Sequence, residues 1–106
     1  MKALISNGKN DLNLVDLPEP ICGPDDLIVK PQAIGICGTD LEIIHNKMDP
    51  AYIRYPATIG HEWTGRVIEI GSNVKGINMG QRVVVEGLIP CNNCHECAAG
   101  ATNRCL

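Results

Sequence analysis

Apolar side chains alternate with polar ones in several short segments, which is the pattern of strands with one buried face. An Asn7-Gly8 step between the first two segments predicts a hairpin. Pro31 interrupts the third segment and predicts an edge position or a bulge, because proline cannot donate to a sheet. The predicted strands cover residues 2–5, 12–17, 27–34, 63–70 and 81–86, with the apolar run 83–85 predicted to be buried. Short strands separated by frequent turn signals indicate a mainly β fold, a small barrel or sandwich.

One short helix is predicted among these strands. Thr39 and Glu42 have the spacing of a capping box, with Thr39 as the N-cap residue and Glu42 at the third helical position. Leu41 and Ile44 would lie on one face of this helix, which would end near Asn46.

The composition limits the class of protein. The chain has 106 residues and only three aromatic side chains, so one modest domain with an aliphatic core is predicted. Its net charge of -3 and the lack of a basic run argue against nucleic acid or an anionic membrane as a partner. No apolar run approaches the length of a membrane span, and polar residues follow directly after Ile5, so no signal segment is predicted. A cytoplasmic protein is expected.

Six cysteines in a reduced compartment favour metal binding over disulfides. Four of them, Cys91, Cys94, Cys97 and Cys105, follow the pattern C-x2-C-x2-C-x7-C, which can close a tetrahedral shell around a structural zinc. The segment 90–106 has few apolar side chains, so a metal would have to order it. An iron–sulfur cluster is the rival interpretation, but bacterial ferredoxins place their fourth cysteine closer. Cys22 has no metal-spaced neighbour and is predicted to be a partly buried free thiol, and His95 a solvated side chain.

A second group of candidate ligands lies in the motifs Gly35-Ile36-Cys37-Gly38-Thr39-Asp40 and Gly60-His61-Glu62-Trp63-Thr64-Gly65. The thiol of Cys37, the imidazole of His61 and the carboxylate of Glu62 would fill three of the four positions around a zinc ion, and an open fourth position is typical of a catalytic site. The hydroxyl of Thr39 suits the proton of an alcohol. Glycines beside the ligands fit a site that must admit a substrate.

These three motifs, in this order and spacing, resemble those of the zinc-dependent medium-chain dehydrogenases, which include alcohol, sorbitol, threonine and sugar dehydrogenases. The resemblance covers essentially the whole chain. It implies a GroES-like β-barrel catalytic domain, with one catalytic and one structural zinc. It also implies NAD(P)-dependent oxidation of a small alcohol or polyol, by zinc-alkoxide formation and hydride transfer, in a homo-oligomer when full length. Cys37 and His61 then match the catalytic zinc ligands, Glu62 a permanent or transient ligand, and Thr39 the residue that contacts the substrate oxygen.

The chain departs from this family in two respects. Many relatives carry a proton-relaying histidine five residues after the zinc cysteine, where this chain has Glu42, so Glu42 or His45 is a candidate relay. No strand–GxGxxG–helix motif is present, so residues 1–106 are interpreted as an N-terminal fragment that lacks the nucleotide-binding domain and is inactive alone. Barrel strands would also be missing. The alternative functions are a non-catalytic zinc-binding interaction module and an iron–sulfur protein.

Overall fold

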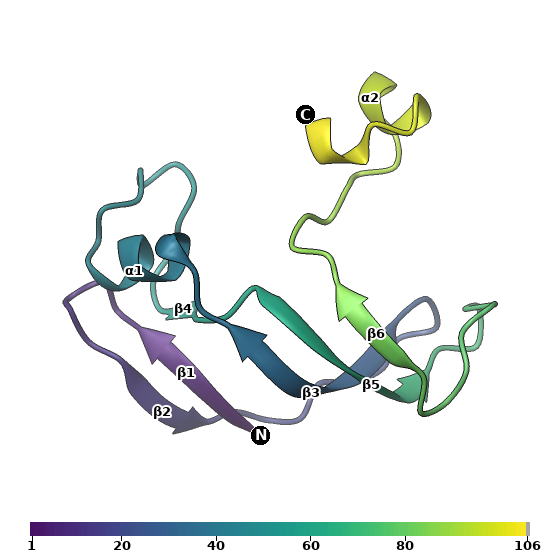
Figure 1. Cartoon of the computed structure of the whole chain (residues 1–106), viewed down its shortest axis with the longest axis horizontal. Coiled ribbons are helices and arrows are strands. Elements are labelled where there is room, and N and C mark those ends of the chain that lie inside the picture. The colour runs from purple at the N-terminus through teal and green to yellow at the C-terminus, as the bar shows by residue number, and fades with distance from the viewer. Residues whose placement is uncertain (106) are drawn as a thin grey trace.

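The chain is described over residues 1–105 in a computed structural model (Figure 1). Leu106, the last residue of the predicted zinc lobe, lies outside the described residues. The elements in chain order are β1 (Lys2–Ser6), β2 (Asn13–Asp16), β3 (Leu27–Gly35), α1 (Gly38–Ile44), β4 (Ala57–Thr58), β5 (Glu62–Ile70), β6 (Arg82–Val85), α2 (His95–Ala98) and the 3-10 helix η1 (Thr102–Arg104). The predicted mainly β fold is confirmed.

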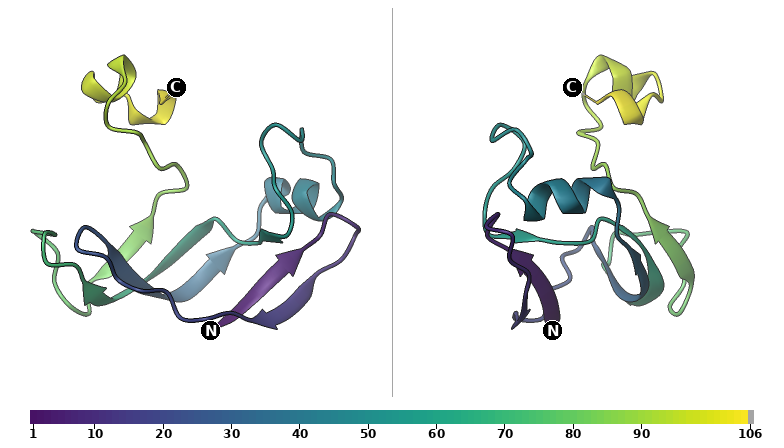
Figure 2. Two further views of the ribbon diagram at one scale, coloured as in Figure 1. Left: turned by 180° about the vertical axis from the view of Figure 1, so that it is seen from behind. Right: turned by 60° about the vertical axis from the view of Figure 1, so that its left-hand side comes forward.

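The strands form two antiparallel sheets, with the orders β2-β1-β4 and β3-β5-β6. Strand β3 is an edge strand, and its register with β5 shifts between Pro31 and Ala33. Both expectations for Pro31 are therefore confirmed, since the proline lies on an edge strand and at an irregularity. The two sheets lie side by side and α1 lies above β4 and β1 (Figures 1 and 2).

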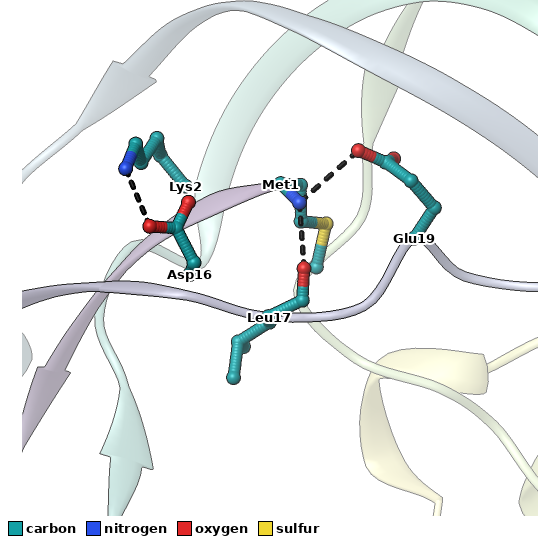
Figure 3. Close-up of polar contacts among 5 residues, drawn as sticks. All are labelled: Met1, Lys2, Asp16, Leu17 and Glu19. Atoms are coloured by element: carbon teal, nitrogen blue, oxygen red, sulfur yellow. Dashed lines mark hydrogen bonds and ion pairs between the residues drawn. The ribbon is translucent and has the colours of Figure 1, made fainter.

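The predicted hairpin of β1 and β2 is confirmed, with Lys2 opposite Asp16, but its connection is longer than a two-residue Asn7-Gly8 turn. The carboxylate of Asp11 organises the loop by accepting hydrogen bonds from Asn7 N at 2.8 Å and Ser6 Oγ at 3.1 Å. At the open end of the hairpin, the Met1 ammonium donates to the Leu17 carbonyl at 2.6 Å, and Lys2 Nζ lies 2.6 Å from Asp16 Oδ2 (Figure 3). The Met1 ammonium also lies 3.1 Å from Glu19 Oε1.

The barrel is not closed within residues 1–105, which agrees with the prediction of an incomplete barrel. A largely apolar cleft of about 770 Å³ lies between the two sheets, lined among others by Leu4, Leu27, Ile34 and Trp63. The predicted burial of the run 83–85 is wrong, because the side chain of Val84 is 84 % exposed. Strand β6 is an edge strand, so its residues alternate between a half-buried and an exposed face.

The capping box of helix α1 lies two residues before the predicted one. Cys37 is the N-cap residue and Asp40 occupies the third helical position, so the prediction of Thr39 as N-cap and Glu42 as its partner is wrong. The apolar face is also shifted, because Ile43 is buried and packs near Ala57 and Ile59, whereas Leu41 is exposed. The segment after α1 leads to the short strand β4, which lies outside the predicted strands.

The C-terminal segment, which has few apolar side chains, contains the single helical turns α2 and η1. It lies at the end of an extended segment, away from both sheets (Figures 1 and 2). Among the residues that the structure describes, no helix has the length and apolar character needed to cross a membrane.

Candidate metal centres

The register of β3 and β5 brings the first group of candidate ligands together. Gly35, at the end of β3, is paired with Glu62, at the start of β5. The residues that continue from these positions, Cys37 and His61, are therefore neighbours although they are far apart in sequence. Cys37 Sγ lies 3.2 Å from His61 Nε2. Cys37, His61 and Glu62 can each place one ligand atom so that all three atoms lie within 4.8 Å of one another.

This spacing fits one tetrahedral ion. Bonds of about 2.1 Å to nitrogen and about 2.3 Å to sulfur separate the two ligand atoms by about 3.6 Å, close to the observed Sγ–Nε2 distance. Cys37 and His61 are half-buried and Glu62 is exposed. The three side chains thus offer one soft sulfur, one imidazole and one carboxylate around a point that remains accessible from solvent.

Asp40, which the sequence analysis did not propose as a site residue, lies behind these ligands. Its carboxylate has no exposed surface and accepts hydrogen bonds from Cys37 N at 2.9 Å and Gly60 N at 3.1 Å. Asp40 Oδ1 also lies 3.3 Å from His61 Nδ1. Burial raises the pKa of Asp40, but the backbone N–H groups of Cys37 and Gly60 and the His61 ring outweigh it and hold the pKa below its usual value.

The Asp40–His61 contact bears on metal binding. A carboxylate next to Nδ1 favours the tautomer that carries its proton there, which leaves the Nε2 lone pair for an ion. Nε2 is the atom that faces Cys37 Sγ. The sequence signal that could have identified Asp40 is its position three residues after Cys37. This is the spacing of a capping box in which Cys37 is the N-cap residue.

Two glycines near the site are required by the backbone conformation and by the close approach of neighbouring strands. Gly60 has a φ of 96°, and a Cβ there would lie 2.6 Å from Ile34 Cγ2. Its conformation turns the chain from β4 into β5 and presents its N–H to Asp40. A Cβ on Gly65 would lie 2.3 Å from the carbonyl oxygen of Lys30, so this glycine allows the close approach of β3. Gly38, by contrast, faces open space and fits the expectation of an accessible site.

The proton-transfer candidates lie along α1. Thr39 is half-buried in the first turn, two residues after Cys37. Glu42 is exposed, and His45 is the C-cap residue, where its Nδ1 lies 2.5 Å from Asn10 Oδ1. Since Cys37 and His45 cap the two ends of α1 and the helix rises about 1.5 Å per residue, His45 lies roughly 12 Å from Cys37 along the helix. His45 thus contacts the β1–β2 loop at the opposite end of α1 from the first centre.

The second group of ligands lies wholly in the C-terminal segment. Cys91, Cys94, Cys97 and Cys105 place their sulfurs within 4.8 Å of one another, and Cys91 Sγ lies 3.9 Å from Cys97 Sγ. Two sulfurs on one tetrahedral zinc are about 3.8 Å apart, so this group also fits an ion. The N–H groups of Asn93 and Cys94 donate to Cys91 Sγ at 3.4 and 3.3 Å and lower the pKa of this thiol.

The two residues predicted to lie outside both centres do so. Cys22 is half-buried with its Sγ 3.5 Å from the Asp26 carbonyl oxygen. Burial, with the negative charges of Glu69 and Asp26, raises the pKa of its thiol. His95 is 90 % exposed, as expected for a solvated side chain.

Comparison with known proteins identifies the family. The model of the alcohol dehydrogenase GroES-like domain matches residues 23–106, and the chain belongs to this family. An L-threonine 3-dehydrogenase of Shewanella sp. (strain W3-18-1) is 41% identical over 99% of this chain. The match covers 31% of that relative, so the chain spans about a third of the length of the curated relatives it matches.

Two solved structures show the same fold. Galactitol-1-phosphate dehydrogenase from Escherichia coli superposes with a TM-score of 0.87 at 31% identity, covering 99% of this chain and 30% of that one. A cobalt- and zinc-bound thermostable alcohol dehydrogenase from Pyrobaculum aerophilum has a TM-score of 0.84 at 28% identity, covering 99% and 32%. The resemblance stated from the three sequence motifs is confirmed.

Proposed function

We propose that residues 1–106 form the N-terminal part of the catalytic domain of a zinc-dependent NAD(P) dehydrogenase. Its substrate would be a secondary alcohol, polyol, sugar or threonine-like molecule. The observation that carries the proposal is the 3.2 Å approach of Cys37 Sγ to His61 Nε2, with Glu62 beside them and the buried Asp40 carboxylate behind His61. Family membership supports the reaction class, and the names of the threonine and galactitol-1-phosphate dehydrogenases support the substrate class.

In this proposal Cys37, His61 and Glu62 hold the catalytic zinc. Zinc supplies Lewis-acid chemistry, which lowers the pKa of an alcohol toward neutrality. Asp40 keeps the proton of His61 on Nδ1, so that Nε2 remains a ligand. The hydroxyl of Thr39 would accept a hydrogen bond from the substrate alcohol and release its own proton outward as it takes up that of the substrate. His45 and Glu42 remain candidates for the next transfer, and the distance of His45 from Cys37 favours Glu42 or water.

The nicotinamide nucleotide that accepts the hydride would be bound outside residues 1–106, since these contain no GxGxxG motif. The four C-terminal cysteines would hold a structural zinc, which takes the place of a hydrophobic core in residues 90–106. A homo-oligomer in the cytoplasm, without nucleic acid or membrane partners, is proposed for the whole protein. The net charge of -3 and the metal-type grouping of the cysteines support this setting.

Metal analysis of the purified protein tests the proposal. Two zinc ions per chain are expected, falling to one in Cys37→Ser and to one in Cys97→Ser. A parent protein that holds only one zinc ion, unchanged in Cys37→Ser, would instead support a non-catalytic zinc module, and iron with visible absorption would support an iron–sulfur protein. Oxidation of L-threonine, sorbitol and sugar phosphates with NAD⁺ and NADP⁺, by protein that includes the nucleotide-binding part, then identifies the substrate. No turnover of any alcohol by zinc-loaded protein would refute the dehydrogenase assignment.

A further inference from the structure

The fourth cysteine of the C-terminal centre is supplied by a different turn from the other three. Cys94 is the N-cap residue of α2, Cys97 lies within α2, and Cys91 precedes both in the chain. Cys105, by contrast, is the C-cap residue of η1. The two turns are joined by the backbone hydrogen bond from Ala101 N to the Glu96 carbonyl oxygen at 2.9 Å. Neither turn contains a buried residue, so a hydrophobic core does not fix their relative position. Other interactions must place Cys105 near the first three sulfurs.

One ion pair spans the two turns. Glu96 of α2 and Arg104 of η1 place Oε2 and Nη2 3.0 Å apart. The Glu96 side chain is only 24% exposed, and its Oε2 atom is buried without an aligned hydrogen bond. Arg104 is therefore the positive partner of a carboxylate oxygen that water does not reach. His95 is the other basic group nearby, with its Nδ1 3.7 Å from Glu96 Oε1, and it is almost fully exposed.

The cysteine sulfurs near Glu96 make its negative charge unfavourable. Glu96 directly precedes Cys97 and Arg104 directly precedes Cys105. Consecutive Cα atoms are about 3.8 Å apart, so both charged groups lie on the order of 10 Å or less from the sulfurs. Four thiolates around one Zn²⁺ carry a net charge of about -2. A partly buried carboxylate beside such a cluster is repelled by it, and removing the positive partner of its buried oxygen is unfavourable.

We infer that Arg104 is a positioning residue for the four-cysteine centre. It holds the turn that carries Cys105 against α2, and it neutralises the Glu96 carboxylate beside the thiolates. The inference rests on the proposed structural zinc. It predicts a specific dependence on charge. Replacing Arg104 weakens metal binding because the Glu96 carboxylate is left without its positive partner, so replacing Glu96 as well restores much of the metal affinity.

The expected order of metal affinities follows. Arg104→Gln should weaken binding about tenfold, because an unpaired carboxylate stays next to the cluster. Glu96→Gln should change it by no more than about threefold, because the lost ion pair is offset by the lost repulsion. The double variant should resemble Glu96→Gln rather than Arg104→Gln. Arg104→Lys, which keeps the charge, should remain within about threefold of the parent.

The measurement uses Co²⁺ as the probe in a His61→Ala background, so that visible absorption reports the four-sulfur centre alone. Titration gives the Co²⁺ dissociation constant, and transfer of Zn²⁺ to a chelator gives the rate of metal loss. Asp16→Asn is the matched control, because it removes another carboxylate ion pair, that with Lys2, far along the chain. Fluorescence of Trp63, the single tryptophan, shows in each variant whether the β5 region is folded.

Three results would overturn the inference. If Arg104→Gln binds Co²⁺ as tightly as the parent, Arg104 has no positioning role, although the centre exists. If the double variant is as weak as Arg104→Gln, charge compensation is not the reason. If the parent itself takes up no Co²⁺ at the cysteines, the structural zinc fails together with the inference. Should Arg104→Gln lose the native Trp63 fluorescence, Arg104→Lys and the double variant still decide between these outcomes.

Discussion

Replacement of Asp40 by asparagine is the sharpest test of how the first metal centre is built. The Asp40 carboxylate is fully buried and accepts two backbone hydrogen bonds, one from Cys37 N and one from Gly60 N, on different oxygens. Its Oδ1 also faces His61 Nδ1. Asparagine has nearly the same shape, so packing is conserved, but it keeps only one acceptor oxygen. Its NH₂ group must then face one of the two N–H donors.

The cost can be worked out from these contacts. A hydrogen bond to a charged group contributes about 1.5 to 3 kcal/mol, and a buried donor left without an acceptor costs about 1 to 3 kcal/mol. Asp40→Asn loses one such bond and leaves either Cys37 N or Gly60 N unsatisfied, so the free energy of unfolding should fall by about 2 to 4 kcal/mol. The ionic partner of His61 is lost as well, and such losses weaken metal binding by about 10- to 100-fold.

Urea denaturation with a chelator present measures the first effect, and zinc competition with a chromophoric chelator measures the second. Asp49→Asn is the control, because Asp49 also accepts from a backbone N–H, that of Ala51 at 2.8 Å, but is exposed. It should change the free energy of unfolding by less than about 1 kcal/mol and leave zinc affinity unchanged. An Asp40→Asn protein as stable as Asp49→Asn, with zinc affinity within twofold of the parent, would refute this account of Asp40.

Three further outcomes are expected. The hydrogen bonds from the Asn7 side chain and then the Asn7 N–H lower the pKa of Asp11, so this group stabilises the fold above its unfolded pKa of about 3.8. That contribution is lost as pH falls below about 4, and thermal unfolding of Asp11→Asn should depend less on pH there than that of the parent. Zinc content should fall by one ion in Cys97→Ser and stay unchanged in Cys22→Ser, and loss of zinc from the latter would show that Cys22 is a ligand. The exposed Val84 on edge strand β6 should promote association of the isolated chain, so Val84→Lys should shift sedimentation toward monomer, and a parent that is already monomeric would contradict this.

The sequence was most informative where one residue type has few alternative uses. The spacing of the four C-terminal cysteines predicts their convergence, because sulfurs at such short intervals can reach a common point whatever the intervening backbone does. Pro31 likewise predicts its own environment, since a residue without an N–H is excluded from the middle of a sheet. The approach of Cys37 to His61 depends on the register of β3 and β5, so the ligand chemistry of the two motifs indicated it only weakly and the resemblance strengthened it.

The errors have a common cause, which is that neighbours in space decide what a local pattern cannot. The run 83–85 looks buried, yet β6 lies at the edge of its sheet and exposes Val84. Leu41 fits an apolar helix face, yet the core beside α1 consists of Ala57 and Ile59 and selects Ile43 instead. Burial of a helix face or strand is set by the partner that packs on it, and the partner is not encoded within the segment itself.

The N-cap of α1 was predicted wrongly at a residue of the candidate metal centre. Thr39 is a far better capping residue than Cys37, whose sulfur is a weak acceptor, so a local rule favours Thr39. With Cys37 at the N-cap position, the helix start is held from the other side, by the Asp40 carboxylate on Cys37 N. The Asp40 N–H also faces the sulfur, which completes the capping box, but sulfur accepts only weakly and can therefore also bind an ion. The hydroxyl of Thr39 is left for a substrate.

This arrangement couples two properties that are usually separate. The same carboxylate fixes the first turn of α1, the Gly60 turn and the Nδ1 side of His61. Local preference is given up at Cys37, which is the kind of departure expected at functional sites. Thr39→Ala should therefore leave stability almost unchanged, because Thr39 is not the cap, while removing the proton acceptor proposed for the substrate alcohol. If the free energy of unfolding falls by about 1 kcal/mol or more in Thr39→Ala, then Thr39 caps the helix. That result would contradict the assignment of the cap to Cys37 and Asp40.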